Sequence, residues 1–318
     1  MDTGVGSCVG PIFPDMSYEY IPIPDLITSE QSTYNNYLGK KGIPLSNFIP
    51  NKLSDQKIHF DPDFRDDINV YGDSTTHQKY LRKLQKKDIV LFYAGLTPWE
   101  NERKQGKSKG IDLYLIGFLE VEKVIKVNII NINKIRNNAH NKRFEYIKYL
   151  HEDIWQEYGV SYSKIIYNIN NKNYFDINLI KNSILKYKKG KKINYSNIKN
   201  FDRDFEKILI KETWKKYIKN SNQEEVIETY MYLLDKFSKF TLVYGTNNSR
   251  LFNRAVKISK RSKNKSGSTE NIVSKKWSKM LGIPMGLSIQ RKNPRWIPNK
   301  KYNLNGKIDK ILQIIQNT

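Results

Sequence analysis

The sequence predicts an α+β protein in which a mainly helical insert interrupts a strand-rich core. Two apolar, β-branched and aromatic runs, residues 88–95 and 113–124, have the length and composition of strands. In residues 144–239, apolar side chains recur at helical spacing, as at Trp214 and Ile218. A further strand-like run, 240–245, follows this stretch. We therefore expect residues 1–143 and 240–318 to form the core, and 144–239 to form an inserted helical subdomain.

The second strand changes character along its length. Its apolar residues are nearly continuous at first and then alternate at Leu119, Val121 and Val124. This change predicts a strand that leaves a closed core for a half-exposed edge. Before the first strand, the lysine-rich residues 76–87 are expected to form a helix. A shorter helix is expected over 28–39, capped by Thr28 or Ser29.

The order of these elements resembles that of PUA-like and EVE-like barrels. In those folds one strand opens with Asp and ends in an aromatic residue, and the next carries Ile-Gly-Phe. Here the corresponding residues are Asp88, Tyr93 and Ile116-Gly-Phe. The resemblance implies a small PUA-like mixed β-barrel core that holds a nucleotide base, often modified, between aromatic side chains. A plain β-hairpin in another α+β domain is the alternative.

The charge is uneven along the chain. The formal net charge is +23. Residues 1–87 carry ten Lys/Arg and eleven Asp/Glu, whereas residues 250–318 carry seventeen Lys/Arg and two Asp/Glu. Because such a one-sided field attracts polyanions and makes binding salt-dependent, we expect a nucleic-acid partner. A chain with solvated lysines everywhere is the alternative, and the near-neutral first quarter argues against it.

The cysteine content and the hydropathy restrict the class of protein. Cys8 is the only cysteine, which excludes an intrachain disulfide and a multi-cysteine zinc site and fits a reducing cytoplasm. The sequence has no apolar run of membrane-spanning length and no secretory signal, so no membrane partner is expected.

The segment His59-Phe-Asp-Pro-Asp63 carries candidate chemistry. In an extended chain, His59, Asp61 and Asp63 project to one face. Such a set binds a divalent metal or supplies an acid and a base. The alternative is a turn in which Asp61 caps the backbone before Pro62. Because the sequence also lacks a Gly-rich phosphate loop and a Cys/His metal set, we expect no bound metal or cofactor.

Two other polar groups are candidate ligand contacts. The Gly- and Pro-punctuated residues 1–25 predict an extended strip that ends at Asp25, with packing over the core as the alternative. The loop before residue 144 holds Asn138, His140 and Arg143, which are suited to a phosphate or a base edge. Simple solvation of this Asn-rich loop is the alternative.

The predicted strand 240–245 leads into Ser249 and Arg250, where the sequence predicts a turn into a short helix. Free backbone N–H groups at a helix start favour an anion, and Arg250 would grip it with two parallel bonds. A structural salt bridge from Arg250 to Asp61 or Asp63 is the alternative. Residues 260–270 are expected to be a disordered basic loop.

The C-terminal region interleaves cations with an aromatic residue, a pattern that suits phosphate contact and base stacking. A basic surface loop anchored by a buried Trp is the alternative. The expected nucleic-acid contacts are Arg254, Arg291, Lys292, Arg295 and Trp296.

Several of these pieces, in this order, resemble the third family of nucleotide-modification-associated domains. The matching pieces are Asp2-Thr-Gly-Val-Gly, Pro11-Ile-Phe-Pro-Asp, Pro22-Ile-Pro-Asp, His59-Phe-Asp-Pro-Asp, Tyr71-Gly-Asp-Ser, Asn138-Ala-His with Arg143, and Ser249-Arg-Leu with Arg254-Ala-Val. The resemblance implies a role around modified nucleotides in DNA, in genome conflict or phage settings, without an established reaction.

The chain departs from that family pattern in two places. The family usually opens with a strand before the Asp-Thr-Gly piece, so we expect either an upstream start or another element in that position. The link between Arg143 and Ser249 is also longer than usual, and whether the insert covers the site or extends it stays open.

Three functions remain open, with a slight preference for the first. As a binding module, a pocket built from these pieces selects a base by stacking on Tyr93 or Trp99. As an enzyme, Asp61 or Asp63 is the general base, His140 is the acid and Arg250 holds the phosphate. As a basic coat, the chain covers nucleic acid without a pocket.

Overall fold

The computed structural model describes residues 9–65, 68–75, 78–99, 111–128, 131–132, 135, 138–149, 237–263, 267, 269–281 and 313. The chain divides into two compact units. The sheet unit comprises Met1–Pro24, Gln31–Ile125 and Thr241–Thr318, and the α2 unit comprises Asp25–Glu30 and Lys126–Phe240.

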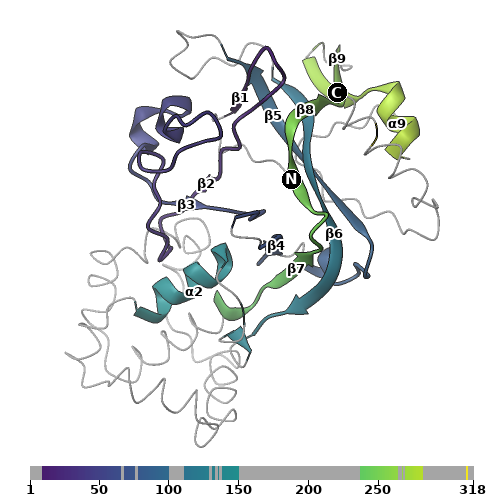
Figure 1. Ribbon diagram of the computed structural model, residues 1–318. Coiled ribbons are helices and arrows are strands. Elements are labelled where there is room, and N and C mark those ends of the chain that lie inside the picture. Colours follow the sequence, from purple (N-terminus) through teal and green to yellow (C-terminus); the bar gives the residue numbers. More distant parts are fainter. Residues whose placement is uncertain are drawn as a thin grey trace, which may run out of the picture. The chain divides into compact units, whose positions relative to one another are not determined.

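Two long antiparallel strands form the centre of the sheet unit (Figure 1). They are β5 (Ile89–Pro98) and β6 (Asp112–Lys126), which confirms both strands predicted from the sequence. Val90 pairs with Leu119 and Ala94 with Tyr114, and the register shifts between Phe92 and Tyr93. β6 is buried without a break from residue 113 to 119. Beyond it only Val121 is buried and residues 122–126 are exposed or half-buried, which confirms a half-exposed end but not a regular alternation.

Four further strands complete one mixed sheet in the order β1-β5-β6-β7-β4, with β8 also paired to β6. β1 (Gly10–Ile12) runs parallel to the end of β5, while β4 (Val70–Asp73) runs antiparallel to β7 (Thr241–Gly245). β8 (Arg250–Lys257) lies antiparallel to the first part of β6. The strand predicted at 240–245 is therefore confirmed.

The sheet is open where the structure describes it, because β1, β4 and β8 each pair with one strand of the sheet and not with one another. The described strands and helices form a sheet-rich α+β arrangement, but they do not close into the predicted small barrel. Closure requires two distant edges to meet, and composition within each strand does not encode which edges those are.

Apolar side chains pack on both faces of β6, which explains its continuous apolar run. One cluster includes Phe92, Ile116 and Leu119, and the other includes Leu115, Phe118 and Trp277. A third cluster lies in the N-terminal segment, around Tyr34, Leu45, Phe48, Ile58 and Phe60.

Helices are few among the described residues. α1 (Gln78–Leu81) is much shorter than the helix predicted at 76–87, and α9 (Lys275–Leu281) follows the last strand. No α-helix forms over the predicted 28–39. Two 3-10 turns, Leu45–Phe48 and Asn51–Leu53, follow instead. None of the described helices is long and apolar enough to cross a bilayer.

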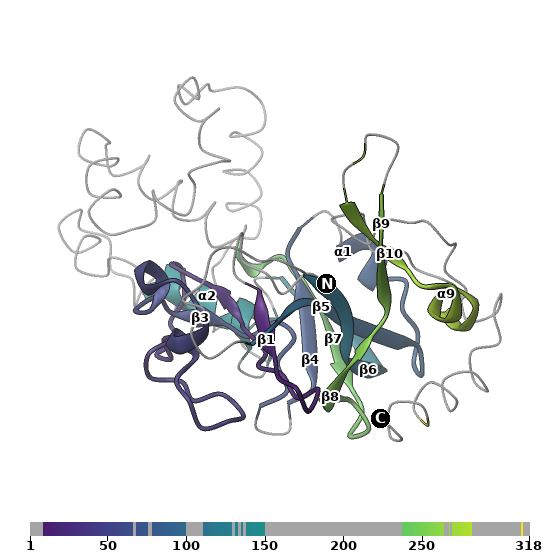
Figure 2. The ribbon, with the colours of Figure 1, turned by 90° about the horizontal axis from the view of Figure 1, so that it is seen from above.

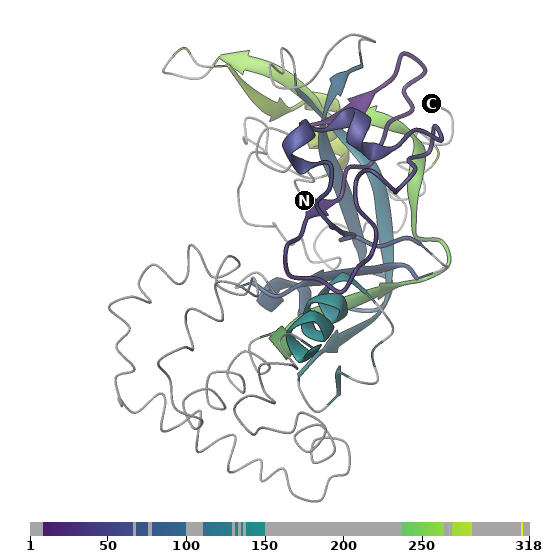
Figure 3. The same ribbon diagram turned by 90° about the vertical axis from the view of Figure 1, so that its left-hand side faces the viewer.

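The segment expected to be a disordered loop at 260–270 contains a hairpin, β9 (Ser259–Lys263) and β10 (Thr269–Val273). Ser259, Asn271 and Val273 are buried. Ser259 and Asn271 form hydrogen bonds with the backbone of Leu113 and Ile111, which anchors the base of the hairpin. The rest of the hairpin extends away from the main sheet (Figures 2 and 3). The prediction of disorder was therefore wrong for these two strands.

The α2 unit contains α2 (Ala139–Tyr149), which begins inside the stretch predicted as a polar loop. Its residues Phe144 and Ile147 are buried. Most of the predicted helical insert, residues 150–236, lies outside the described part of the chain, so that prediction stays untested.

Candidate functional site

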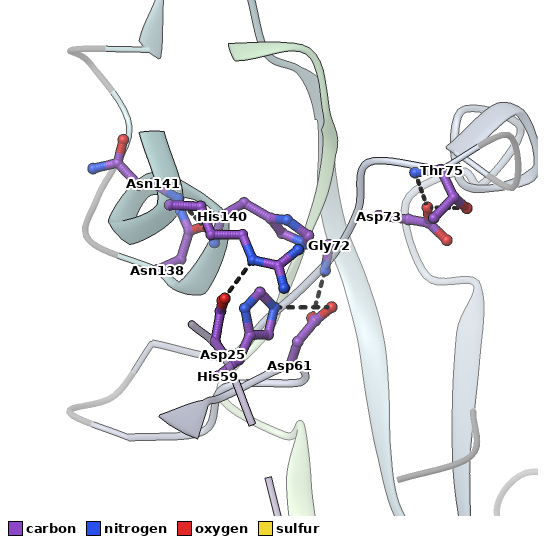
Figure 4. Close-up of polar contacts among 10 residues, drawn as sticks. Asp25, His59, Asp61, Gly72, Asp73, Thr75, Asn138, His140 and Asn141 are labelled. Carbon is purple, nitrogen blue, oxygen red and sulfur yellow. Dashed lines mark hydrogen bonds and ion pairs between the residues drawn. The ribbon is translucent and has the colours of Figure 1, made fainter. Parts of the chain in front are cut away.

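A buried histidine and a buried aspartate face each other in the sheet unit (Figure 4). His59 ends the short strand β3 (Ile58–His59), which pairs with β2 (Ile23–Pro24). The Nε2 atom of His59 lies 4.0 Å from Oδ2 of Asp61. The side chains are only 4% and 10% exposed, so bulk solvent screens the pair weakly.

The Asp61 carboxylate is oriented by a neighbouring strand. Its Oδ1 atom accepts a hydrogen bond of 2.9 Å from the backbone N–H of Gly72 in β4. This bond directs the second oxygen, Oδ2, toward His59 (Figure 4). The Asp61–Pro62 peptide bond is cis.

Asp63, which the sequence placed on the same face as Asp61, has a different role in the structure. Its backbone exchanges two hydrogen bonds with Val70, and its carboxylate accepts bonds from Nε and Nη2 of Arg65, at 3.0 and 2.8 Å. Arg65 also covers the ring of Phe60 at 3.5 Å. Asp63 therefore anchors a turn, and Asp61 is the carboxylate that faces the imidazole.

Two buried tyrosines lie close enough to Asp61 for its charge to raise the pKa of their hydroxyls. Burial raises the pKa of the Tyr20 and Tyr71 hydroxyls well above the ordinary value, and the negative charge of Asp61 raises both further. Both phenol groups are therefore neutral at ordinary pH.

The aromatic residues expected to stack on a base differ in their surroundings. Trp99 packs edge-on against Phe48, with ring centroids 4.9 Å apart, and against Phe13. Its ring is thus part of the N-terminal apolar cluster. Tyr93 is half-buried beside the second cluster of β6, and its stacking role stays a prediction.

In the α2 unit, the candidate ligand residues contact one another. Nε of Arg143 donates to Oδ2 of Asp25 at 2.5 Å, and the other oxygen of Asp25 accepts from the Ile27 N–H at 3.0 Å. Because Asp25 is fully buried and Arg143 is 21% exposed, this ion pair fixes the 25–30 segment against α2. The Ser29 hydroxyl also joins this segment to α2, because it donates a hydrogen bond to Oε2 of Glu145 at 2.8 Å.

Asn138 is the N-cap of α2. Its Oδ1 atom accepts from the backbone N–H groups of His140 and Asn141, at 3.0 and 3.1 Å. The His140 ring is buried and stacks on Phe240 at a centroid distance of 5.2 Å. The predicted partnership of His140 with Asp61 or Asp63 joins residues of different units and stays a prediction.

The segment after β7 turns into a strand, not into the predicted helix. Ser249 closes a tight turn through its N–H to Thr246, and its Oγ accepts from the Glu120 N–H at 3.0 Å. Arg250 then opens β8, is exposed, and donates to the Asn248 carbonyl at 3.3 Å. The structure thus provides no helix start for an anion here, although Arg250 itself stays accessible.

Sequence reasoning missed two carboxylates that organise the sheet unit. Glu19 is buried and accepts from the successive backbone N–H groups of Lys40 and Lys41, each at 2.8 Å. Glu120 accepts from Thr246 and Asn248, which lowers its pKa. Both partner sets lie far along the chain, and no local pattern signals them.

Residues 250–281, here called the basic segment, are rich in exposed cations. It contains ten Lys/Arg and one acidic residue, Glu270. The described exposed members are Arg250, Arg254, Lys257, Lys260, Lys263, Lys275, Lys276 and Lys279. The other predicted nucleic-acid contacts, Arg291, Lys292, Arg295 and Trp296, lie outside the described residues.

Comparison with known protein families identifies a relationship for the first half of the chain. The family model described as nucleotide modification associated domain 3 matches residues 1–166. The matched range includes the His59–Asp61 pair and His140, and it ends before Ser249 and Arg250. No curated protein and no solved structure matches the chain.

Proposed function

The chain belongs to the nucleotide modification associated domain 3 family, and from this premise we propose that it recognises a modified nucleotide base in DNA. The observation that carries the proposal beyond the family is the basic segment, whose exposed cations suit a phosphate backbone. The proposed setting is DNA modification or genome defence.

In this proposal, different parts of the protein contact the DNA backbone and the base. Backbone contacts place a protein on nucleic acid, while contacts to base edges give specificity. Lysines such as Lys275 and Lys276 on α9 supply the first kind of contact. The buried polar groups around His59 and Asp61 are suited to the second kind, because hydrogen bonds discriminate best where water is excluded.

A thermal-shift series on the full chain tests recognition of a modified base. The probes are ordinary nucleoside monophosphates and their methylated, hydroxymethylated and glucosylated counterparts. A ligand that binds only the folded state at one hundred times its Kd stabilises by about 2.7 kcal/mol. We expect one modified nucleotide to raise Tm more than its parent does. Equal shifts throughout the series contradict base recognition.

An enzyme is the second candidate, and the buried His59–Asp61 pair is the observation that favours it. In this alternative, Asp61 or Asp63 acts as general base and His140 as acid. Incubation with DNA followed by mass spectrometry of the released nucleosides separates the two functions. A new nucleoside that disappears with Asp61→Asn supports catalysis, and unchanged nucleosides support recognition alone.

A non-specific basic coat is the third candidate, and it rests on charge alone. It predicts equal affinity for every duplex of the same length, whatever its bases. A preference for modified DNA at one fixed salt concentration removes it.

A further inference from the structure

The His59–Asp61 pair has the chemistry of a metal-binding site. Imidazole nitrogen and carboxylate oxygen are both ligands for Mn²⁺, Fe²⁺ and Zn²⁺. A metal ion of this kind lies about 2.0–2.2 Å from such atoms, so two of its ligands lie within about 4 Å of each other. The observed 4.0 Å between Nε2 of His59 and Oδ2 of Asp61 is within that reach and is too long for a direct hydrogen bond.

Both side chains are held by the fold. His59 lies in β3, whose backbone pairs with Ile23 of β2. The bond from the Gly72 N–H to Oδ1 of Asp61 is the kind of supporting contact that orients a metal-ligating carboxylate. Because the backbone donates this bond, the orientation is independent of any side-chain rotamer of the donor.

The other buried aspartate of this turn shows the contrast. Asp63 receives its counter-charge from Arg65 through two hydrogen bonds. Asp61 faces the His59 imidazole through its Oδ2 atom. The carboxylate that faces a nitrogen ligand is therefore that of Asp61, and the arginine-paired carboxylate of Asp63 is not part of this pair.

We propose that Nε2 of His59 and Oδ2 of Asp61 bind one first-row divalent metal ion. Its remaining coordination positions would take water or phosphate oxygens, as in metal sites that use few protein ligands. The proposal is independent of the proposed function, because the metal alone is the probe. A plain imidazolium–carboxylate ion pair is the competing explanation.

Titration of the chelator-treated full chain with Mn²⁺, followed by the decrease of the free-ion EPR signal, tests the site. We expect one saturable equivalent, and Zn²⁺ should displace it in calorimetry. Asp61→Asn and His59→Gln should each weaken binding about tenfold or more. Asparagine keeps an oxygen for the Gly72 N–H, so the first variant preserves the turn.

Asp55→Asn is the matched control, because Asp55 is an exposed carboxylate of the same unit that accepts a bond from Asn35. It should bind Mn²⁺ as the unaltered chain does. The absence of saturable binding, or unchanged binding in both site variants, overturns the proposal.

A measurement on the unaltered chain does not depend on whether the variants fold. In the presence of dissolved O₂, Fe²⁺ with ascorbate generates reactive oxygen species at the bound metal, and these oxidise adjacent side chains; peptide mass spectrometry locates the added oxygen. The chain has four histidines, His59, His77, His140 and His151. Oxidation that includes His59 supports the site, and oxidation confined to other residues contradicts it.

Discussion

Buried carboxylates are held in distinct ways in this protein. Backbone N–H groups of a turn hold Glu19, whereas an arginine holds Asp63 in one unit and another arginine holds Asp25 in the other. Each arrangement supplies the hydrogen bonds that a buried charge requires. Asp25 and Asp63 therefore have a structural role before any ligand is considered.

Substitution of Arg250 tests the hypothesis that this residue grips the anionic group of the ligand with two parallel hydrogen bonds, here called the anion clamp. Since its side chain is exposed, Arg250→Lys should change the free energy of unfolding by no more than about 0.5 kcal/mol. A clamp with two parallel bonds should lose about 1–3 kcal/mol of nucleotide affinity, because lysine cannot reproduce them. Urea unfolding and calorimetry on the same sample measure both.

Arg82→Lys is the control for this change, because Arg82 is an exposed arginine whose guanidinium contacts Gln78 and Thr241 within the fold. Its nucleotide affinity should equal that of the unaltered chain. Full affinity in Arg250→Lys would end the clamp hypothesis. A loss of stability would favour the structural salt bridge, although Asp63 already pairs with Arg65.

Asp15 makes part of the stability depend on acid pH. Hydrogen bonds from the Ser17 hydroxyl and N–H, with a smaller contribution from Lys41, lower the pKa of Asp15 from 3.8 to about 2. Because the folded-state pKa lies below the unfolded one, the contribution is complete above about pH 4 and is lost as pH falls through about 2.

Ser17→Ala should move the Asp15 pKa back toward its ordinary value, as followed by NMR titration of the carboxyl carbon. Acid unfolding of this variant should then show a smaller change in stability between about pH 4 and pH 2. Ser262→Ala, which removes a hydroxyl that donates to the carbonyl of the neighbouring Lys263, is the control. An unchanged Asp15 titration in Ser17→Ala would show that the hydroxyl is not the cause.

At the scale of elements, α2 depends on its first residues. Asn138→Ala removes the oxygen that caps two backbone N–H groups and should lower the free energy of unfolding by about 1 kcal/mol. Asn138→Asp keeps an acceptor next to the positive end of the helix and should be nearly neutral. Urea unfolding followed by circular dichroism measures both. Unchanged stability together with weaker nucleotide binding would instead support the ligand role predicted from the sequence.

Local sequence was sufficient for some elements. β5, β6 and β7 were predicted because each is an apolar run whose length and composition can be recognised from adjacent residues alone. The helix expected at 28–39 fails because the Tyr34 and Asn35 N–H groups bond the carbonyls of Gln56 and Ser54. Distant partners satisfy this backbone, and propensity cannot foresee them.

The site residues show the same division between local and distant information. Asn138, Arg143 and Asp25 have the polar chemistry of ligand contacts, which is all that composition reveals. The structure uses Asn138 to cap a helix and joins Arg143 to Asp25 across more than a hundred residues. Similarly, the bond from Gly72 to Asp61 becomes visible only when β4 is placed beside the turn.

At the scale of the whole chain, the asymmetry of charge is the feature most open to measurement. Residues 1–87 are close to neutral, and the excess of cations appears in the later parts of the sequence. In α9, Trp277 is buried against the sheet while Lys275, Lys276 and Lys279 are exposed. The packing of this helix therefore presents its lysines to solvent, where they can meet a polyanion.

These three lysines are expected to contact the DNA backbone. Changing Lys275, Lys276 and Lys279 together to Gln should weaken binding to every DNA duplex, because phosphate contacts are independent of sequence. The slope of log affinity against log salt should become shallower by about 0.9 for each phosphate that is no longer neutralised by a lysine. Fluorescence anisotropy at several salt concentrations measures the slope.

The matched control is the change of three other exposed lysines to Gln, Lys52, Lys83 and Lys86. They lie in the near-neutral first quarter and carry the same charge. If both triple variants flatten the slope equally, net charge alone governs binding and the basic segment has no special role. If neither does, the segment is not the DNA-binding surface.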